Sequence, residues 1–140
     1  MSDSEIATPE FTTGSTARVS TERPARYGKQ LTSHMGRKIH ASWDEGARSG
    51  RLLLNREGPV TGVVDLSCEE GALVLVLRTD EDHLEGIEHV VGIHLARFGA
   101  KEAMRVDWVR DDGAPGTAQG PLSPEDMERM RAEREARRTS

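Results

Sequence analysis

Residues Asp80–Gly99, DEDHLEGIEHVVGIHLARFG, form the clearest helical segment of the chain and are the starting point for predicting its fold. Apolar side chains recur in it at alternating spacings of three and four residues, which places them on one face of an α-helix. Asp80 is a candidate N-cap, and Gly99 is typical of the position just after a helix end. We therefore predict a helix over residues 80–98. Its apolar stripe consists of Leu84, Ile87, Val91, His94 and Phe98.

A second helix is predicted upstream, over residues 22–38. Pro24 is tolerated in its first turn, because the N–H that proline lacks would have no partner inside the helix there. The apolar stripe of this helix is formed by Tyr27, Leu31 and Met35. His34 falls three residues after the middle member of that stripe and so lies on the same face. Each predicted helix therefore carries one histidine on its apolar side.

Short apolar runs separated by turn residues predict strands in the rest of this region. The predicted strands cover residues 39–43, 51–55, 60–68, 72–77 and 103–109. Hairpin-length connections imply antiparallel pairing, and helices with a single apolar stripe imply that both pack on one sheet face. The predicted fold is α+β, with an antiparallel sheet of four to five strands and two helices on one face, in the order α-β-β-β-β-α-β.

The chain is divided by composition into four predicted parts. Residues 1–17 are rich in Ser, Thr and Gly without a hydrophobic period, which predicts a disordered arm. Residues 18–110 form the α+β domain. Residues 111–122 are a predicted linker, and residues 123–140 are a predicted charged helical tail that is loosely attached, with little apolar surface to bury.

Composition excludes several classes of protein. No run approaches the roughly 20 apolar residues that span a bilayer, and the acidic N-terminus is unlike a secretory signal, so no membrane association is expected. The single cysteine, Cys68, suits a reducing compartment, and we expect a cytoplasmic protein. The net charge is −5, and no Lys/Arg run is interleaved with aromatic residues, so no nucleic-acid binding is expected.

The histidines on the two stripes are the main candidates for chemistry. If both helices cover one sheet face, His34 and His94 can approach each other, and an acid such as Asp65 or Asp107 would complete a minimal metal site. Two facing histidines are also able to hold a haem. The alternative is that each is a half-buried structural histidine bonded to a backbone carbonyl or a carboxylate.

No motif of nucleophilic or phosphate-transfer chemistry is present. The sequence lacks HExxH, GxSxG, GxGxxG, a phosphate loop and a cysteine cluster. Cys68 falls on the inward face of a predicted strand, where it behaves as a small apolar residue. We therefore predict that the protein is not an enzyme.

Several segments resemble a small bacterial family called "domain of unknown function 2218". They are RPARYGKQLTSHMGRK at residues 23–38, IEHVVGIHLARFG at residues 87–99 and VDW at residues 106–108. The resemblance covers about residues 17–110 and implies an α+β domain. The positions that match the family's pattern, and so are candidate ligand-binding residues, are Lys29, Gln30, His34, His94, Arg97 and Trp108. Relatives often carry a second histidine three residues after the first, where this chain has Arg37.

The resemblance also implies a functional setting. Members of that family occur alone, or joined to or near siderophore-interacting reductases, which suggests a role around iron acquisition. The leading expectation is a small accessory or binding domain associated with iron or siderophore handling. The alternatives are a metal- or haem-binding protein that uses His34 and His94, with iron or haem as cofactor, and a module that pairs with itself as a homo-oligomer or with a siderophore-interacting reductase.

Overall fold

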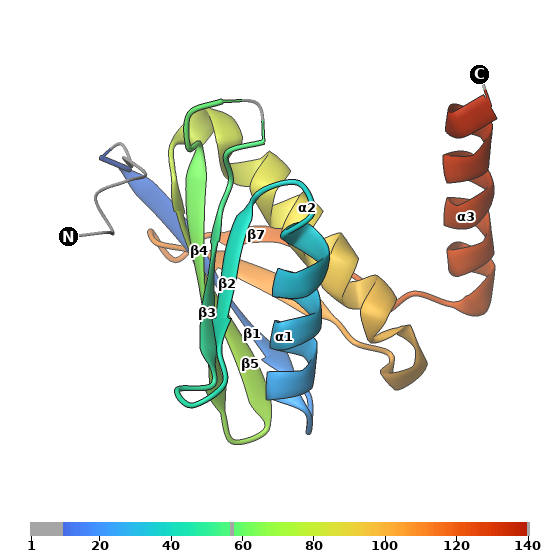
Figure 1. The fold of residues 1–140 in the computed structure, drawn as a ribbon, viewed down its shortest axis with the longest axis horizontal. Coiled ribbons are helices and arrows are strands. Elements are labelled where there is room, and N and C mark those ends of the chain that lie inside the picture. Colours follow the sequence, from blue (N-terminus) through green and yellow to red (C-terminus); the bar gives the residue numbers. More distant parts are fainter. Residues whose placement is uncertain (1–9, 57, 140) are drawn as a thin grey trace.

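A seven-stranded antiparallel sheet forms the centre of the fold in the computed structural model, which describes residues 10–56 and 58–139 (Figure 1). The strand order across the sheet is β2-β3-β4-β5-β1-β6-β7. The strands are β1 (Thr13–Ser20), β2 (His40–Asp44), β3 (Ser49–Leu53), β4 (Gly62–Glu69), β5 (Ala72–Thr79), β6 (Val106–Arg110) and β7 (Pro115–Gln119). The helices are α1 (Pro24–Met35), α2 (Glu81–Phe98), α3 (Pro124–Thr139) and the short 3-10 helix η2 (Ala100–Glu102). The α+β class and the antiparallel pairing are as predicted.

The predicted order α-β-β-β-β-α-β is wrong because it lacks two strands. The first is β1, which lies between β5 and β6 in the sheet and pairs with both. Its Thr13–Ala17 half belongs to the segment predicted to be a disordered arm, and that prediction is wrong for those residues. Residues 1–9 lie outside the described residues. The inward side chains of the first half of β1, Ser15 and Ala17, are small, so this part of the strand carries little hydrophobic signal in the sequence.

The second missing strand is β7, which forms one edge of the sheet beside β6. It falls inside residues 111–122, which were expected to form a linker, and that expectation is wrong for Pro115–Gln119. Proline is accepted at the first residue of an edge strand, because no ladder hydrogen bond is required of its nitrogen there. Beyond it, the C-terminal helix is present as α3, and Figure 1 shows it standing apart from the sheet. None of the helices in the described ranges has both the length and the apolar composition needed to cross a membrane.

The two long helices α1 and α2 cover the same face of the sheet (Figure 1). α1 packs over β2, β3, β4 and β5, whereas α2 packs over β1, β5, β6 and β7. The core between helices and sheet includes Leu31 from α1, Val91 and Leu95 from α2, and Leu75 and Leu77 from the sheet. All five side chains are fully buried. This packing fixes the two helices side by side, so that a groove opens between them.

An ion pair with a buried carboxylate ties α2 to the β6–β7 edge of the sheet. The carboxylate of Glu88 is fully buried and accepts from the Arg110 guanidinium at 3.0 Å and 3.2 Å and from the Thr117 amide at 3.1 Å. Burial alone raises the pKa of Glu88, but hydrogen bonds from Arg110 and Thr117 outweigh it and hold the pKa below its usual value. The carboxylate therefore stays ionised and anchors the first half of α2 to the sheet.

A second buried contact fixes the later half of α2. Gly92 faces the side chain of Gln119 so closely that a Cβ at this position would overlap the amide oxygen. That oxygen accepts from the indole Nε1 of Trp108 at 2.9 Å. A residue without a side chain is needed at Gly92 for the strand and the helix to approach this closely.

Candidate ligand-binding groove

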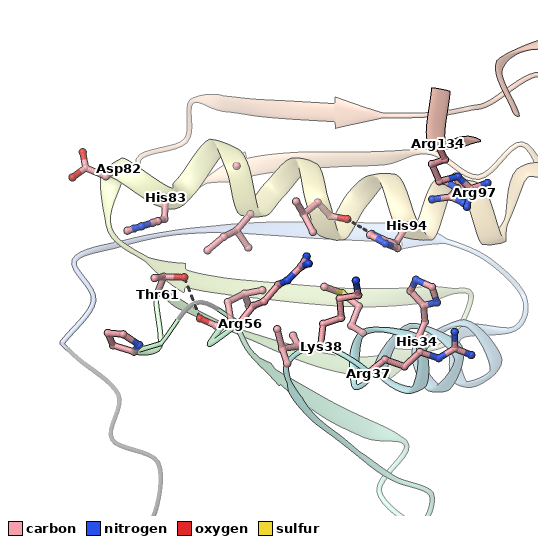
Figure 2. A pocket seen from close by; sticks show the side chains of 17 residues that line it. His34, Arg37, Lys38, Arg56, Thr61, Asp82, His83, His94, Arg97 and Arg134 are labelled. Atoms are coloured by element: carbon pink, nitrogen blue, oxygen red, sulfur yellow. Dashed lines mark hydrogen bonds between the residues drawn. The ribbon is translucent and has the colours of Figure 1, made fainter. Parts of the chain in front are cut away.

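The fold brings His34 of α1 and His94 of α2 together. The centroids of the two imidazole rings are 5.0 Å apart, and the ring planes are inclined by 46°. The ring of Phe98 meets that of His34 edge-on, with the centroids 5.4 Å apart. Figure 2 shows the two histidines on facing helices, with His34 on α1 and His94 on α2. Both side chains are half-buried, and both line a pocket between the helices.

The hydrogen bonding of His94 fixes which ring nitrogen is free. Its Nδ1 lies 2.7 Å from the carbonyl oxygen of Val90, one helical turn earlier. A carbonyl oxygen only accepts, so Nδ1 carries a hydrogen and donates it. The nitrogen that remains free to bind a ligand is therefore Nε2.

His34 has a different environment. Neither of its ring nitrogens forms a hydrogen bond with another residue that the structure describes. Burial lowers the pKa of His34, and the positive charges of Arg37, Arg97 and Arg134, together with the neighbouring His94, lower it further. The imidazole of His34 is consequently held in its neutral form at neutral pH.

The pocket beside the histidines is a groove with an apolar floor. Its volume is about 680 Å³, within the range of roughly 300–1,000 Å³ that is common for small-molecule sites. The apolar lining is formed by Met35, Ile39, Leu54, Pro59, Ile87 and Val90. Val90 is 40% exposed, although it belongs to a helix that packs on the core. An exposed apolar side chain within a concave surface is typical of a ligand site.

The rim of the groove is strongly basic. Five cationic side chains line it, whereas Asp82 is the single carboxylate among the described lining residues. The cations are Arg37, Lys38, Arg56, Arg97 and Arg134 (Figure 2). None of the five forms an ion pair with a carboxylate in the part of the chain that the structure describes. A chain with a net charge of −5 thus places a group of unpaired positive charges around one apolar groove.

Arg97 is the least exposed of these cations. Its side chain is half-buried, and burial lowers the pKa of its guanidinium, followed by the nearby charge of Arg134. The guanidinium remains charged, because an arginine does not lose its proton in a protein. A half-buried cation without a counterion is unfavourable in the free protein, and a bound anion would relieve this cost.

The other candidate residues from the sequence lie in different places. Lys29 is exposed on α1 and forms an ion pair with Glu45. Gln30 lines a second pocket of about 690 Å³, which shares Arg97 with the groove. Trp108 is buried in the core and does not line either pocket. Of the six candidates, the structure therefore joins only His34, His94 and Arg97 in the groove.

The acids proposed to complete a metal site lie on the other face of the sheet. Asp65 alternates with the inward-facing Val64 and Leu66 and pairs with Arg51 at 2.7 Å. Asp107 is likewise exposed and pairs with Arg105 at 2.9 Å. The expectation that either acid joins the histidines is therefore wrong. Among the described residues, no group of three or more His, Cys, Asp or Glu side chains is arranged to hold a metal ion.

The sequence carries little signal for most residues of the basic rim. Arg37 and Lys38 follow directly after α1, Arg56 follows β3, and Arg134 comes from α3. These residues are far apart in the chain, and only the packing of α1 against α2 gathers them. The one available signal was the excess of basic over acidic residues around the first helix.

Comparisons with known proteins place the chain within one family without supplying an activity. The model of the family described as "Uncharacterized protein conserved in bacteria (DUF2218)" matches residues 16–109. The NMR structure of PA4090 from Pseudomonas aeruginosa is similar, with 27% sequence identity and a TM-score of 0.54, over 71% of this chain and 95% of that one. No curated protein matches the chain.

Proposed function

The chain belongs to the bacterial DUF2218 family, and we propose that it is a binding domain that holds an amphipathic organic anion in the groove between α1 and α2. The observation that carries this proposal is the combination of an apolar floor with five unpaired cations on its rim. A ligand with an aromatic or aliphatic body and an acidic group satisfies both features at once.

Each feature adds its own part of the affinity. The apolar body of the ligand removes the floor residues, including Val90, from water, at roughly 25 cal/mol for each Å² of apolar surface buried. The acidic group accepts charge-assisted hydrogen bonds from guanidinium groups such as that of Arg97. A neutral apolar compound would gain only the first of these contributions, and a small inorganic anion only the second.

We propose binding without chemical turnover. Thr61 is the hydroxyl-bearing residue among the described groove residues, and its hydroxyl donates to the carbonyl of Leu54 at 3.1 Å. It is not hydrogen-bonded to either histidine. Cys68 lies outside the groove, and burial raises the pKa of its thiol. Among the described residues of the groove, none is therefore a nucleophile held against a base, which supports the proposal of binding alone.

Fluorescence titration with anilinonaphthalene sulfonate (ANS) tests the proposal. N-phenylnaphthylamine carries the same ring systems without the sulfonate and reports the apolar contribution alone. We expect ANS to bind more tightly than the neutral compound, and Arg97→Gln to weaken ANS by about tenfold while leaving the neutral compound unchanged. Arg105→Gln, which removes an exposed arginine outside the groove, is the matched control. Equal binding of both compounds to the wild-type protein would refute the proposal.

The convergence of the two histidines favours a second candidate, the binding of a transition-metal ion. At metal–nitrogen distances of about 2.0–2.1 Å, two imidazoles on one ion have ring centroids about 5 Å apart, as His34 and His94 do. The remaining ligands would have to be water or the bound anion itself. The charges of Arg37, Arg97 and Arg134 oppose a bare cation at this position, which places this candidate second.

Titration with Zn(II), Fe(II) and haemin tests this second candidate. Spectral or calorimetric changes that disappear in both His34→Ala and His94→Ala would support it. The absence of any change in the wild-type protein would eliminate it. The iron or siderophore connection implied by the family resemblance fits either candidate, because an iron chelator with aromatic rings and acidic oxygens is itself an amphipathic anion. Displacement of bound ANS by such a chelator would support that connection.

A further inference from the structure

We infer that the acidic head of the bound anion lies on the His34–His94 pair beside Arg97, and that it is bound together with a proton. This end of the groove would then be a proton-linked anion subsite. The inference rests on the proposed function, and it adds the orientation of the ligand and the condition under which the ligand is held.

The hydrogen bond of His94 to its own helix determines what its other ring nitrogen offers to a ligand. Because Nδ1 donates to the Val90 carbonyl, Nε2 of the neutral ring has only a lone pair to offer. A lone pair repels the oxygen atoms of an anion. Addition of a proton converts Nε2 into a charged donor, which attracts them. Contact between His94 and an anion therefore requires protonation.

His34 extends the same subsite. Its ring lies against that of His94, with 5.0 Å between the centroids, and its nitrogens have no hydrogen-bond partner within the described ranges. A proton gained by either ring is therefore close to the other ring and to any oxygen placed between them. The ring of Phe98 lies beside both imidazoles, with centroid distances of 5.4 Å to His34 and 6.4 Å to His94.

The charges that face the pair make its protonation depend on the anion. Arg37 faces His34 from the end of α1, Arg97 from α2 and Arg134 from α3, and all three are positive. The single carboxylate of the groove, Asp82, is twelve residues before His94 on α2, or about 18 Å along the helix axis. The protonated pair thus has no counterion within the described part of the groove, and the ligand supplies one.

Binding of the anion and protonation of the histidine pair favour each other. The anion stabilises the protonated imidazole, so the pKa of the imidazole is higher in the complex than in the free protein. At pH values between these two pKa values, binding of the anion takes up protons from solution. Affinity then increases as the pH falls through this interval, by up to about tenfold per pH unit for each proton taken up. The sulfonate of ANS stays ionised throughout this range, so the protein is the source of any change.

Isothermal titration calorimetry with ANS on the full chain tests the inference directly. Titrations at about pH 6.5 in buffers with different ionisation enthalpies measure the protons taken up per ANS bound. We expect net uptake in the wild-type protein, and a higher ANS affinity at about pH 5.5 than at about pH 7.5. N-phenylnaphthylamine should bind without uptake and with the same affinity at both pH values, because it has no acidic group.

Substitutions of the two histidines test whether the proton is taken up by His34 and His94. His34→Gln and His94→Gln should each reduce the proton uptake, and the double variant should abolish it while still binding ANS. His89→Gln, which removes an exposed histidine of the same helix outside the groove, should behave as wild type. ANS binding with no proton uptake in the wild-type protein would overturn the inference and leave the proposed function standing. No ANS binding at either pH would overturn both.

Discussion

The imidazole rings of His34 and His94, from two different helices, lie with their centroids 5.0 Å apart. One of these histidines is hydrogen-bonded to its own helix, whereas the other has both nitrogens free of partners among the described residues. Three arginines surround the pair. This arrangement is unfavourable for a protonated imidazole in the free protein, and it is favourable once an anion is bound.

The pH dependence of stability should report His34. Its pKa is lowered in the folded protein, so the unfolded chain binds more protons below the ordinary pKa of about 6.5. The free energy of unfolding therefore falls as the pH decreases from about 6.5 through the lower pKa of the folded state. We expect thermal melts to show a loss of a few degrees over this interval, and a smaller loss in His34→Gln. An identical loss in His34→Gln and in wild type, with His89→Gln as control, would refute this assignment.

Truncation of the Glu88–Arg110 ion pair should be strongly destabilising. Glu88→Ala leaves the half-buried Arg110 guanidinium without its counterion and the Thr117 amide without its acceptor, and is expected to cost about 2–4 kcal/mol, measured by urea denaturation. Arg105→Ala breaks an exposed pair with Asp107 and should cost less than about 1 kcal/mol. Similar losses in the two variants would contradict the assignment of the Glu88 pair as the anchor of α2.

Acid should weaken the same anchor. The pKa of Glu88 is lowered on folding, so its contribution to stability is present above its ordinary pKa and is lost as the pH falls through the folded value. We expect Glu88→Gln to be less sensitive than wild type to acid below about pH 4.5, in a range well separated from that of His34. A wild-type acid response in Glu88→Gln would show that other carboxylates dominate.

Two glycines of α2 should respond to alanine in opposite ways. At Gly86 a Cβ meets nothing within 4 Å, so Gly86→Ala should stabilise the protein by up to about 1 kcal/mol through helix propensity. At Gly92 a Cβ would overlap Gln119, whose oxygen accepts from Trp108. Gly92→Ala should therefore lower the melting temperature. Stabilisation by both substitutions would show that β7 does not pack against α2 as described.

The sequence predicts those parts of the fold that carry strong periodicity. The helix around Val91 and the strands around Val64 and Leu75 follow from the spacing of their apolar residues, and the structure contains all three. The strands β1 and β7 do not have this signal. β1 buries small residues at the centre of the sheet, and β7 is an edge strand that begins with Pro115, so neither resembles an apolar alternating run.

The candidate site is predicted only in part, for a related reason. The histidines follow from helical periodicity, since each falls on an apolar stripe. Trp108 looks similar in the sequence to a site residue but is buried against Gln119. The rim cannot be derived from spacing, because Arg37 follows α1, Arg56 follows β3 and Arg134 lies in α3. A reductase partner and self-association involve surfaces that no contact in the structure tests, and both stay predictions.

A chemical-shift titration of the labelled protein with ANS shows whether the groove binds an amphipathic anion. We predict saturable shifts of backbone amides at His34, Val90, His94 and Arg97, with no shifts at Asp65 or Asp107 on the opposite sheet face. Shifts confined to that opposite face, or no saturable shifts at all, would contradict the account.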